Sequence, residues 1–495
     1  MKLYSSNLTD SILSKCDIFW DAILIESIKW NKVSWNDYKN LALSYAQKLL
    51  ENGIKQGDSI VIFVKDITKF SYIALGVLLV WGKLIIIESD YSEQILKEKL
   101  KFIQPDLVIM EGFLYKLLHI PFIKKLHRIK KFRPLIRYSK KVISESWKNY
   151  VQKWNNEEYL LTKIDSDTES LVVFTWWTTW KPKWVVHTLW TLEVMFQRIW
   201  KVVWDDTKIF YADLPHFVLM WVNMWVKVIA WENNISDSKF LDTLKTYSID
   251  TTFSPPYRYI NFAQHKKKLP KTLKHILLWS APIYISFLEK IYKVIDKDTK
   301  VTCIYWMTEI LPISYIDGRE KIEKTVDGDN LWNILDGIII NILEDWEWVV
   351  SWKGLMMKYL WWEKIEKHKT WDLLIFEGDY LIMKWRKKDM ILRKDYNIYP
   401  SLYEPIINSI PWVVESALVG VFDKSEEDEK IILFLEVQNR VYTENKYFKY
   451  LKTWKYAIDT FALPDEIIFC TLPRKWRQNK IDKQYLRNNY KKQWK

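Results

Sequence analysis

The sequence predicts an α/β protein with a large N-terminal domain of layered sheets and helices, a β-rich subdomain, and a small mobile α+β C-terminal domain. Three observations lead to this prediction. The chain has 495 residues, more than a single hydrophobic core usually organises. Short apolar strands alternate with helical segments from residue 33 to residue 313, which is typical of largely parallel sheets. Between about residue 332 and residue 383 the pattern changes to short strands separated by charged turns.

The expected elements of the N-terminal domain alternate between strand and helix. Residues 33–55 predict a helix that Gly53 closes, because glycine is common just past the last turn. Residues 72–87 form the most apolar stretch and predict a buried helix that runs into a core strand. Core strands are expected at 58–63, 84–87, 106–110, 171–174, 208–211 and 301–305.

The end of the chain predicts a compact unit that follows a hinge. Residues 385–389 are the expected hinge, and they divide the chain into predicted domains 1–384 and 385–495. Within the second domain, strands are expected near 414–422 and 430–437, and a helix near 444–458.

Composition narrows the class of protein. Charged residues make up 27% of the chain and apolar residues 49%, which indicates a folded protein rather than a disordered one. The first 17 residues contain no apolar leader segment. Residues 72–87 are too short to span a bilayer and contain Lys83, so we expect a cytoplasmic protein. Cys16, Cys303 and Cys470 lack metal-ligand spacing, which fits inert thiols in a reducing compartment.

The net charge of +13 favours anionic partners as a class, among them ATP, coenzyme A, nucleic acid and acidic membranes. The charge alone selects none of these, and a solvated, lysine-rich surface is the favoured explanation. Residues 122–141 combine basic and apolar side chains. Two interpretations of this segment stay open: peripheral contact with acidic lipid, and an exposed helix or loop, which is favoured. We expect no nucleic-acid partner.

Glycine is scarce and tryptophan abundant throughout the chain. There are 11 glycines and 30 tryptophans, whereas glycine averages about 7% of residues in proteins. No glycine lies between Gly112 and Gly318. A fold cannot easily omit glycine, because tight turns and close backbone approaches need a residue without Cβ. Our hypothesis is that UGA codons, read as glycine in some bacterial lineages, are translated here as tryptophan.

Individual tryptophans fit this hypothesis to different degrees. Trp231, Trp346, Trp348 and Trp412 stand in turn-like contexts where glycine is expected, whereas Trp35 has the context of a genuine tryptophan. The competing hypothesis is a tryptophan-rich protein that uses its indoles at a membrane interface or on glycans. It does not explain the missing glycines.

The segment 171–188, LVVFTWWTTWKPKWVVHT, carries the most chemistry. An apolar strand leads into hydroxyl side chains and then into two lysines that flank Pro182. With glycine at 176, 177, 180 and 184 it becomes FTGGTTGKPKGVVHT, in which backbone N–H groups and lysines can surround phosphate. It differs from the GxxxxGK[ST] loop, because proline follows Lys181. With literal tryptophans it would be an aromatic turn.

This glycine-restored segment resembles the signature of the adenylate-forming superfamily, which includes acyl-CoA synthetases. Further motifs of that family follow in the same order, and the resemblance covers about residues 20 to 490. They are LWSAP (278–282), YWMTE (305–309), TWDL (370–373), WRKKD (385–389), NIYP (397–400) and KID (480–482). Each motif is weak or moderate alone, and their joint order is specific.

The resemblance implies a site for ATP and Mg²⁺. It places Thr308 at the α-phosphate and Glu309 on Mg²⁺, with Thr178 as a second metal contact. Tyr305 would stack on adenine, Asp372 would accept the ribose hydroxyls, and Arg386 would lie beside ribose and phosphate. Without the resemblance, Thr308 and Glu309 would be interpreted as a helix cap and Tyr305 as a packing residue. The remaining ATP-binding positions are Thr175, Trp176, Trp177, Thr178, Thr179, Lys181, Lys183, Ser280, Ala281 and Pro282.

The resemblance also implies catalytic, hinge and substrate positions outside the phosphate loop. Lys480 would bridge the carboxylate and the α-phosphate in the transition state, and Lys388 would be the hinge residue between two domain arrangements. His216 and Phe217 fall in the acid pocket. The lysine motif departs from the family pattern, because Asn479 replaces its glycine.

The implied reaction is the activation of a carboxylic acid by ATP to acyl-AMP with release of pyrophosphate, followed by transfer to coenzyme A. Apolar content between 214 and 315 favours a fatty or aryl acid over an amino acid. Two alternatives stay open. One is an acyl-AMP ligase that loads a separate carrier protein, and the other is a non-catalytic binding protein on the same fold if the tryptophans are literal.

Overall fold

The structure is a computed structural model, and the part of the chain that it describes covers most of both predicted domains. It describes residues 2–27, 32–87, 93–120, 129, 131–145, 159–175, 183–203, 206–212, 218–231, 235–279, 283, 285–324, 329–331, 333–343, 347–351, 354–360, 363–378, 380–386, 390–393, 396–398, 400–423, 428–438, 443–452, 456, 458–475 and 480–493.

The first large sheet has seven strands, and its central strands are parallel. Such strands are covered on both faces, which explains their nearly continuous apolar runs. The predicted strands at 58–63, 84–87, 106–110 and 171–174 are confirmed. In spatial order the strands are β20 (Lys358–Tyr359), β10 (Lys183–Thr188), β9 (Glu169–Thr175), β5 (Lys83–Ile86), β4 (Ser59–Phe63), β6 (Leu107–Glu111) and β7 (Lys141–Glu145).

The second large sheet has eight strands, with an antiparallel strand at each edge of a parallel centre. It confirms the predicted strands at 208–211 and 301–305. The order is β16 (Ile310–Asp317), β15 (Lys300–Met307), β14 (His275–Leu278), β13 (Thr251–Ser254), β11 (Ile209–Ala212), β12 (Lys227–Ala230), β2 (Ile23–Ser27) and β3 (Lys32–Ser34). A separate parallel pair joins β1 (Lys2–Ser5) to β8 (Leu160–Lys163).

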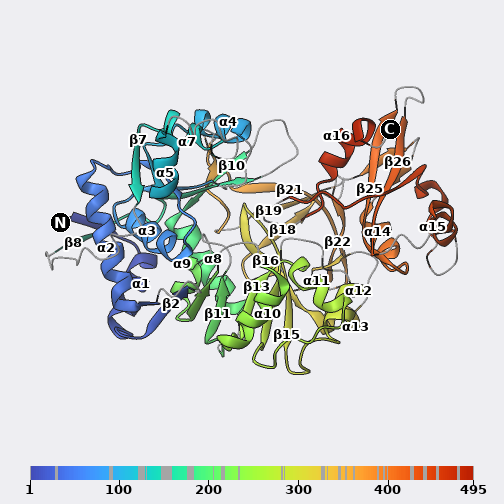
Figure 1. Cartoon of the computed structure of the whole chain (residues 1–495), viewed down its shortest axis with the longest axis horizontal. Coiled ribbons are helices and arrows are strands. Elements are labelled where there is room, and N and C mark those ends of the chain that lie inside the picture. Colours follow the sequence, from blue (N-terminus) through green and yellow to red (C-terminus); the bar gives the residue numbers. More distant parts are fainter. Residues whose placement is uncertain are drawn as a thin grey trace.

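Helices form layers between and outside the two sheets (Figure 1). The middle layer contains α1 (Asn7–Ile18), α2 (Trp35–Glu51), α3 (Ile67–Leu79), α8 (Leu189–Val202) and α9 (Val218–Asn223), which share one core with strands of both sheets. The outer face of the first sheet is covered by α4 (Glu93–Ile103), α5 (Gly112–His119) and α7 (Arg133–Arg137). The outer face of the second is covered by α10 (Asp237–Thr246), α11 (Tyr257–Gln264), α12 (Ile285–Ile291) and α13 (Gly318–Glu323).

Helices α2 and α3 confirm two of the sequence predictions. Every residue of α3 is buried, as expected for the most apolar stretch. Gly53, just after α2, has φ +79°, the left-handed conformation that favours glycine. Gly76 lets α3 approach α2 closely, since a Cβ there would lie 3.0 Å from the Ala42 carbonyl oxygen. In the described ranges, no helix is long and apolar enough to cross a membrane.

The predicted β-rich subdomain is a five-stranded antiparallel sheet that lies between the large sheets and the C-terminal elements (Figure 1). Its core is shared with Val185 of β10 and Ile310 of β16, so it packs against both large sheets. The order is β17 (Asp329–Asn330), β22 (Tyr380–Arg386), β21 (Lys367–Glu377), β19 (Glu347–Ser351) and β18 (Ile339–Ile342).

The small C-terminal domain has its own three-stranded sheet and its own apolar core. Its strands are β25 (Val413–Asp423), β26 (Asp428–Val437) and β27 (Glu466–Phe469), beside the pair β23 (Ile391–Arg393) and β24 (Tyr396–Ile398). Its helices are α14 (Pro400–Asn408), α15 (Glu444–Leu451), the 3₁₀ turn η3 (Thr460–Ala462) and α16 (Lys483–Gln493). The domain boundary stays a prediction, and Trp385 and Arg386 are part of β22.

The helix predicted near 444–458 is too long. It ends at Leu451, where the carbonyl oxygen accepts a hydrogen bond from the Ile458 N–H at 3.1 Å. A helix continuing to 458 would pair that oxygen with the residue four positions on. Ile458 lies instead in the apolar core of the domain.

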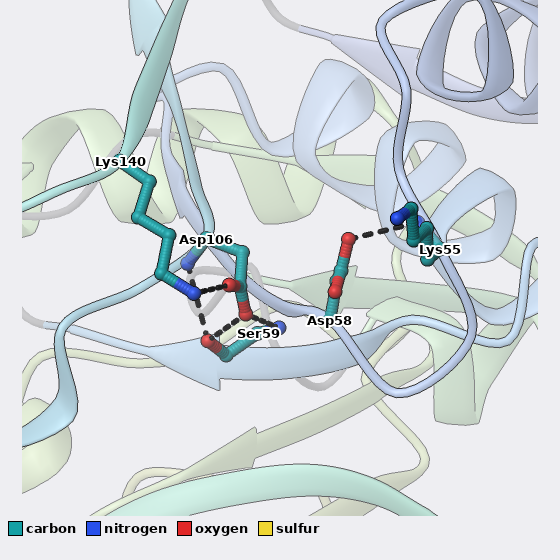
Figure 2. Close-up of polar contacts among 5 residues, drawn as sticks. All are labelled: Lys55, Asp58, Ser59, Asp106 and Lys140. Atoms are coloured by element: carbon teal, nitrogen blue, oxygen red, sulfur yellow. Dashed lines mark hydrogen bonds and ion pairs between the residues drawn. The ribbon is translucent and has the colours of Figure 1, made fainter.

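A polar cluster ties the beginnings of two parallel strands together (Figure 2). Asp106, just before β6, accepts hydrogen bonds from both the N–H and the hydroxyl of Ser59 at 2.8 Å. Lys140 lies 2.5 Å from the other carboxylate oxygen, and its own side chain is 71% exposed. Partial burial works to raise the pKa of Asp106, but the hydrogen bonds from Lys140 and Ser59 hold it below its ordinary value.

We therefore predict that Asp106→Asn lowers the free energy of unfolding by about 1–2 kcal/mol at neutral pH, since it removes the charge and puts an N–H₂ donor in place of one of the two acceptor oxygens that Ser59 and Lys140 use, in a partly exposed site. Because the pKa is depressed in the folded state, this contribution is present above the unfolded pKa and is lost as pH falls through the folded one. Urea unfolding at several pH values measures this. Lys140→Ala is the matched control and should cost less, because the Lys140 side chain is 71% exposed and both Ser59 hydrogen bonds to Asp106 remain; equal losses in both variants would contradict the assignment.

Candidate functional site

The candidate site lies where the turn between β15 and β16 meets β10, β20 and β21. Thr308 and Glu309 form this turn, and Met307 pairs with Ile310 across it. The helix-cap interpretation of the two residues is therefore wrong, because strands precede and follow them. Carboxyl ends of parallel strands are where open α/β sheets bind ligands.

Glu309 is a buried carboxylate with partners from two other sheets. Its side chain is 2% exposed, and the Tyr359 hydroxyl donates to its Oε1 at 3.0 Å. The His368 Nε2 lies 3.9 Å from the same oxygen. Burial, and after it the charge of Glu309, raises the pKa of Tyr359, so the phenol stays a donor at neutral pH.

A second contact links the same turn to the strand that follows the phosphate loop. The His187 Nε2, on β10, is 2.8 Å from the Thr308 carbonyl oxygen, and the ring is 1% exposed. Burial lowers the pKa of His187 to about 4, so the ring is neutral at pH 7. A carbonyl only accepts, so the neutral ring donates through Nε2, while the Thr191 hydroxyl is 3.3 Å from Nδ1. This fixes the turn relative to the phosphate-loop strand.

Tyr305 and Asp372 are brought into direct contact. The Tyr305 hydroxyl donates to the Asp372 Oδ2 at 2.5 Å, and the Asp372 side chain is fully buried. The Thr370 hydroxyl accepts from the Asp372 N–H at 3.2 Å. The motifs predict that Tyr305 contacts adenine and that Asp372 contacts ribose. In the fold the two side chains are also hydrogen-bonded to each other.

Two indoles occupy the motif positions where the family pattern has glycine. Trp279, after β14, stacks on Phe253 with ring centroids 5.1 Å apart at 16°. Trp306 packs edge-on against Trp279 at 4.5 Å and 63°. Trp279 follows the carboxyl end of β14, and Trp306 lies near the carboxyl end of β15, two positions before Thr308.

The remaining predicted residues divide into those that the structure places and those that it does not describe. Thr175 and Lys183 are partners in the β9–β10 register, and Arg386 is the register partner of Asp372. Lys480 is half-buried in the C-terminal domain. Outside the described residues lie Trp176, Trp177, Thr178, Thr179, Lys181, Ser280, Ala281, Pro282, His216, Phe217 and Lys388.

His187, Tyr359 and His368 are the site residues that sequence reasoning missed. His187 stood in the phosphate-loop segment without an assigned role, and the other two lay in a region of short strands. Tyr359 and His368 come 50 or more positions after Glu309, so the sequence does not show that they are its neighbours. The available signal for His187 was a titratable side chain that directly follows the apolar run 184–186 in strand 183–188.

The chemistry of Glu309 is compatible with Mg²⁺. Among the described residues, no group of three or more His, Cys, Asp or Glu could hold a metal by itself. Mg²⁺ is commonly held by one or two carboxylates together with substrate phosphates and water, and a carboxylate oxygen that accepts from Tyr359 keeps a further lone pair. Glu309 therefore fits the role of a single carboxylate ligand to an Mg²⁺ ion that binds together with substrate phosphates.

Comparisons with known proteins show what this chain is similar to. A family model described as AMP-binding enzyme matches residues 19–338. The long-chain-fatty-acid–CoA ligase FadD13 of Mycobacterium tuberculosis is 32% identical over 116 residues, a match that covers only 23% of this chain and 22% of that ligase. The probable 4-coumarate–CoA ligase 3 of Dictyostelium discoideum is 20% identical over 443 residues, 81% of this chain and 80% of that protein.

The fold is that of solved structures of similar size. ATP-bound MatB from Rhodopseudomonas palustris aligns with a TM-score of 0.81 at 18% identity and covers 99% of both chains. At this identity the likeness concerns the fold, a large N-terminal and a small C-terminal domain.

We predict that Tyr359→Phe lowers the free energy of unfolding by about 1–3 kcal/mol, because it removes the donor to a buried carboxylate. A double-mutant cycle with Glu309→Gln, followed by urea unfolding, measures the interaction. The two substitutions should be non-additive by about 0.5–3 kcal/mol, as expected for residues in contact. Additive losses would show that the hydroxyl does not stabilise Glu309.

Proposed function

The chain belongs to the AMP-binding enzyme family, and from this premise we propose that it activates a carboxylic acid with ATP and transfers the acyl group to coenzyme A. The observation that carries the proposal is the convergence of Thr308, Glu309, Tyr305 and Asp372 at the carboxyl ends of the strands, next to the phosphate-loop strands. The relatives are ligases for long-chain fatty and 4-coumaric acids by name, which supports an aliphatic or aryl acid as substrate.

In the first step a carboxylate oxygen attacks the α-phosphorus of ATP, and the bond to the β-phosphate breaks as pyrophosphate leaves with its electron pair. The thiolate of coenzyme A then attacks the acyl carbon, and AMP leaves. Charge neutralisation and in-line positioning supply most of the catalysis in such transfers. The separate-carrier alternative differs only in the thiol.

The chain's own residues position and neutralise the reactants. Thr308 would hydrogen-bond the α-phosphate. The turn that carries Thr308 is held by His187, whose ring donates to the Thr308 carbonyl oxygen. Asp372 would hold the ribose hydroxyls, because a carboxylate accepts several hydrogen bonds and can keep Tyr305. Lys480 would balance charge between the carboxylate and the α-phosphate. Mg²⁺, held through Glu309, would neutralise phosphate oxygens when bound.

We further propose that the natural protein has glycine at many of the tryptophan positions. Three backbone conformations support this: φ is +59° at Trp81, +64° at Trp225 and +71° at Trp412. A residue with a Cβ costs roughly 1–2 kcal/mol in this left-handed region, whereas glycine adopts it freely. The Trp412 conformation agrees with its turn-like context after Pro411.

Position 184 of the phosphate loop adds a steric argument. The Trp184 and Phe174 ring centroids are 2.8 Å apart at 52°, whereas packed aromatic rings keep their centroids about 4.5–7 Å apart. The two rings of this β9–β10 register pair therefore crowd each other, and glycine at 184 would remove the crowding. The turn-like context inferred for Trp348 is wrong, because Trp348 lies in β19 and is buried, and Trp35 is buried at the start of α2. Neither has a positive φ.

If the tryptophans are native, a different function follows. Trp279 and Trp306 then fill the carboxyl ends of the strands where a nucleotide would lie. We would then propose a non-catalytic binding protein on this fold. The identity of the native residues thus decides between the two functions.

We predict acid-dependent exchange of radiolabelled pyrophosphate into ATP by a chain with glycine restored at the motif positions, tested with a panel of fatty and aryl acids. Lys480→Ala should reduce the exchange rate on the order of 10²- to 10³-fold, the usual loss for an electrostatic group that stabilises a transition state. Lys449→Ala, a lysine on α15, is the control and should retain the rate. Absence of exchange with every acid would contradict the proposed function, and thioester formation with coenzyme A or a carrier would identify the acceptor.

For the glycine proposal, we predict glycine at 176, 177, 180 and 184 when the natural protein is purified from its source and its peptides are sequenced by mass spectrometry. Peptides covering 81, 225 and 412 should also contain glycine, while Trp35 should remain tryptophan. Tryptophan throughout would refute the proposal and favour the binding function.

A further inference from the structure

Two glutamates face each other on neighbouring strands of the C-terminal sheet. Glu415 on β25 and Glu436 on β26 are direct partners in the antiparallel register. Like charges at such positions destabilise a sheet unless a cation lies between them. Burial raises the pKa of Glu415 above its ordinary value, although Arg474 opposes this effect. The pair therefore depends on a compensating charge.

Arg474 supplies that charge with both ends of its guanidinium group. Its Nη1 is 2.5 Å from the Glu415 Oε2, and its Nη2 is 2.9 Å from the Glu436 Oε2. The three side chains are only 19%, 23% and 25% exposed, so solvent screens the pairs weakly. A planar fork that bonds two carboxylates fixes the orientation of the side chain and of its backbone.

The backbone of Arg474 is in turn paired with the segment that carries Lys480. Arg474 and Ile481 form an isolated antiparallel bridge. The Lys475 N–H donates to the Lys480 carbonyl oxygen at 2.7 Å, and the Asp482 N–H donates to the Pro473 carbonyl oxygen at 2.7 Å. We call these two paired segments, 473–475 and 480–482, the lysine clamp.

Segment 480–482 of the lysine clamp is held by apolar packing and by the first turn of α16. Ile481 packs against the apolar cluster that includes Leu472, Leu486 and Tyr490. The Asp482 Oδ1 accepts from the Tyr485 N–H at 3.0 Å at the beginning of α16. On the near side, Leu472 donates its N–H to the Glu436 Oε2 at 3.2 Å, next to Arg474.

We propose that Arg474 is a positioning residue for Lys480: its bridge across Glu415 and Glu436 holds the lysine clamp on the sheet and thereby places the Lys480 ammonium for adenylation. This inference rests on the role of Lys480 in the proposed function. Arg474 itself does not touch the reactants. Its removal leaves two partly buried carboxylates facing each other, and the clamp loses its side-chain attachment to β25 and β26. A displacement of about 1 Å at a reacting group can reduce a rate roughly 10²-fold.

The test compares Arg474→Met and Arg474→Lys in the full-length, glycine-restored chain. In acid-dependent pyrophosphate exchange, we expect Arg474→Met to lower kcat roughly 10²-fold while the KM for ATP changes little. Lysine at 474 should recover part of the rate, because it keeps the charge but not the fork. Thioester formation from supplied acyl-adenylate and coenzyme A should be retained, since Lys480 acts in the first step. An unchanged kcat in Arg474→Met would overturn the proposal.

A triple variant separates positioning from stability. Glu415→Gln and Glu436→Gln combined with Arg474→Met remove the facing charges and should restore stability to urea without restoring kcat. Recovery of the wild-type rate in this variant would mean that Arg474 only balances charge, and the proposal would fall.

Limited trypsin digestion tests the clamp without any activity. Cleavage after Lys480 requires local opening of the paired segments, so Arg474→Met should accelerate it about tenfold while cleavage in α15 is unaffected. Equal cleavage rates after Lys480 would overturn the proposal. If the parent chain shows no exchange with any acid but the digestion result holds, the proposed function is lost while the anchoring of Lys480 by Arg474 stands.

Discussion

The burial of the Glu309 carboxylate is the constraint on which the candidate site depends. A charge that is 2% exposed is costly unless hydrogen bonds or counter-charges replace the lost water. Tyr359 comes from the edge strand β20, and His368 comes from β21 of the five-stranded sheet. Glu309 itself belongs to the turn at the edge of the eight-stranded sheet. The three sheets must therefore meet at this one point.

The backbone reinforces this meeting point in a second way. The Met356 N–H donates to the Glu309 carbonyl oxygen, and the Met357 N–H donates to the carbonyl oxygen of Val186 on β10, both at 2.8 Å. His187, the next residue of β10, reaches the Thr308 carbonyl oxygen. The segment leading to β20 thus connects the phosphate-loop strand with the acidic turn. This arrangement holds β10 beside the turn at residues 308–309, although the two are more than a hundred positions apart in the sequence.

In the C-terminal domain, too, a partly buried charged side chain holds a short segment in place, and here the central charge is positive. There a cation, Arg474, is held by two carboxylates on adjacent strands, and the backbone that it fixes leads to Lys480. Each half of the molecule uses a partly or fully buried charge to orient a short irregular segment. Such segments lack the regular hydrogen bonding that fixes helices and strands, so side chains must supply it.

The tryptophans in turns differ from the tryptophan at position 184, which lies in a strand. The positive φ angles at positions 81, 225 and 412 belong to turns, where a side chain can still project outward. At position 184, within a strand, the side chain faces the ring of its register partner Phe174 on β9 and cannot project away from it.

The sequence by itself determined the layered α/β architecture, since buried parallel strands are read from apolar runs such as 58–63 and 106–110. It also determined the order of the motifs. Only the tertiary structure decided that Tyr305 pairs with Asp372 and that Tyr359 contacts Glu309, because such contacts depend on how separate sheets pack, and periodicity along one strand carries no information about a neighbour in another sheet.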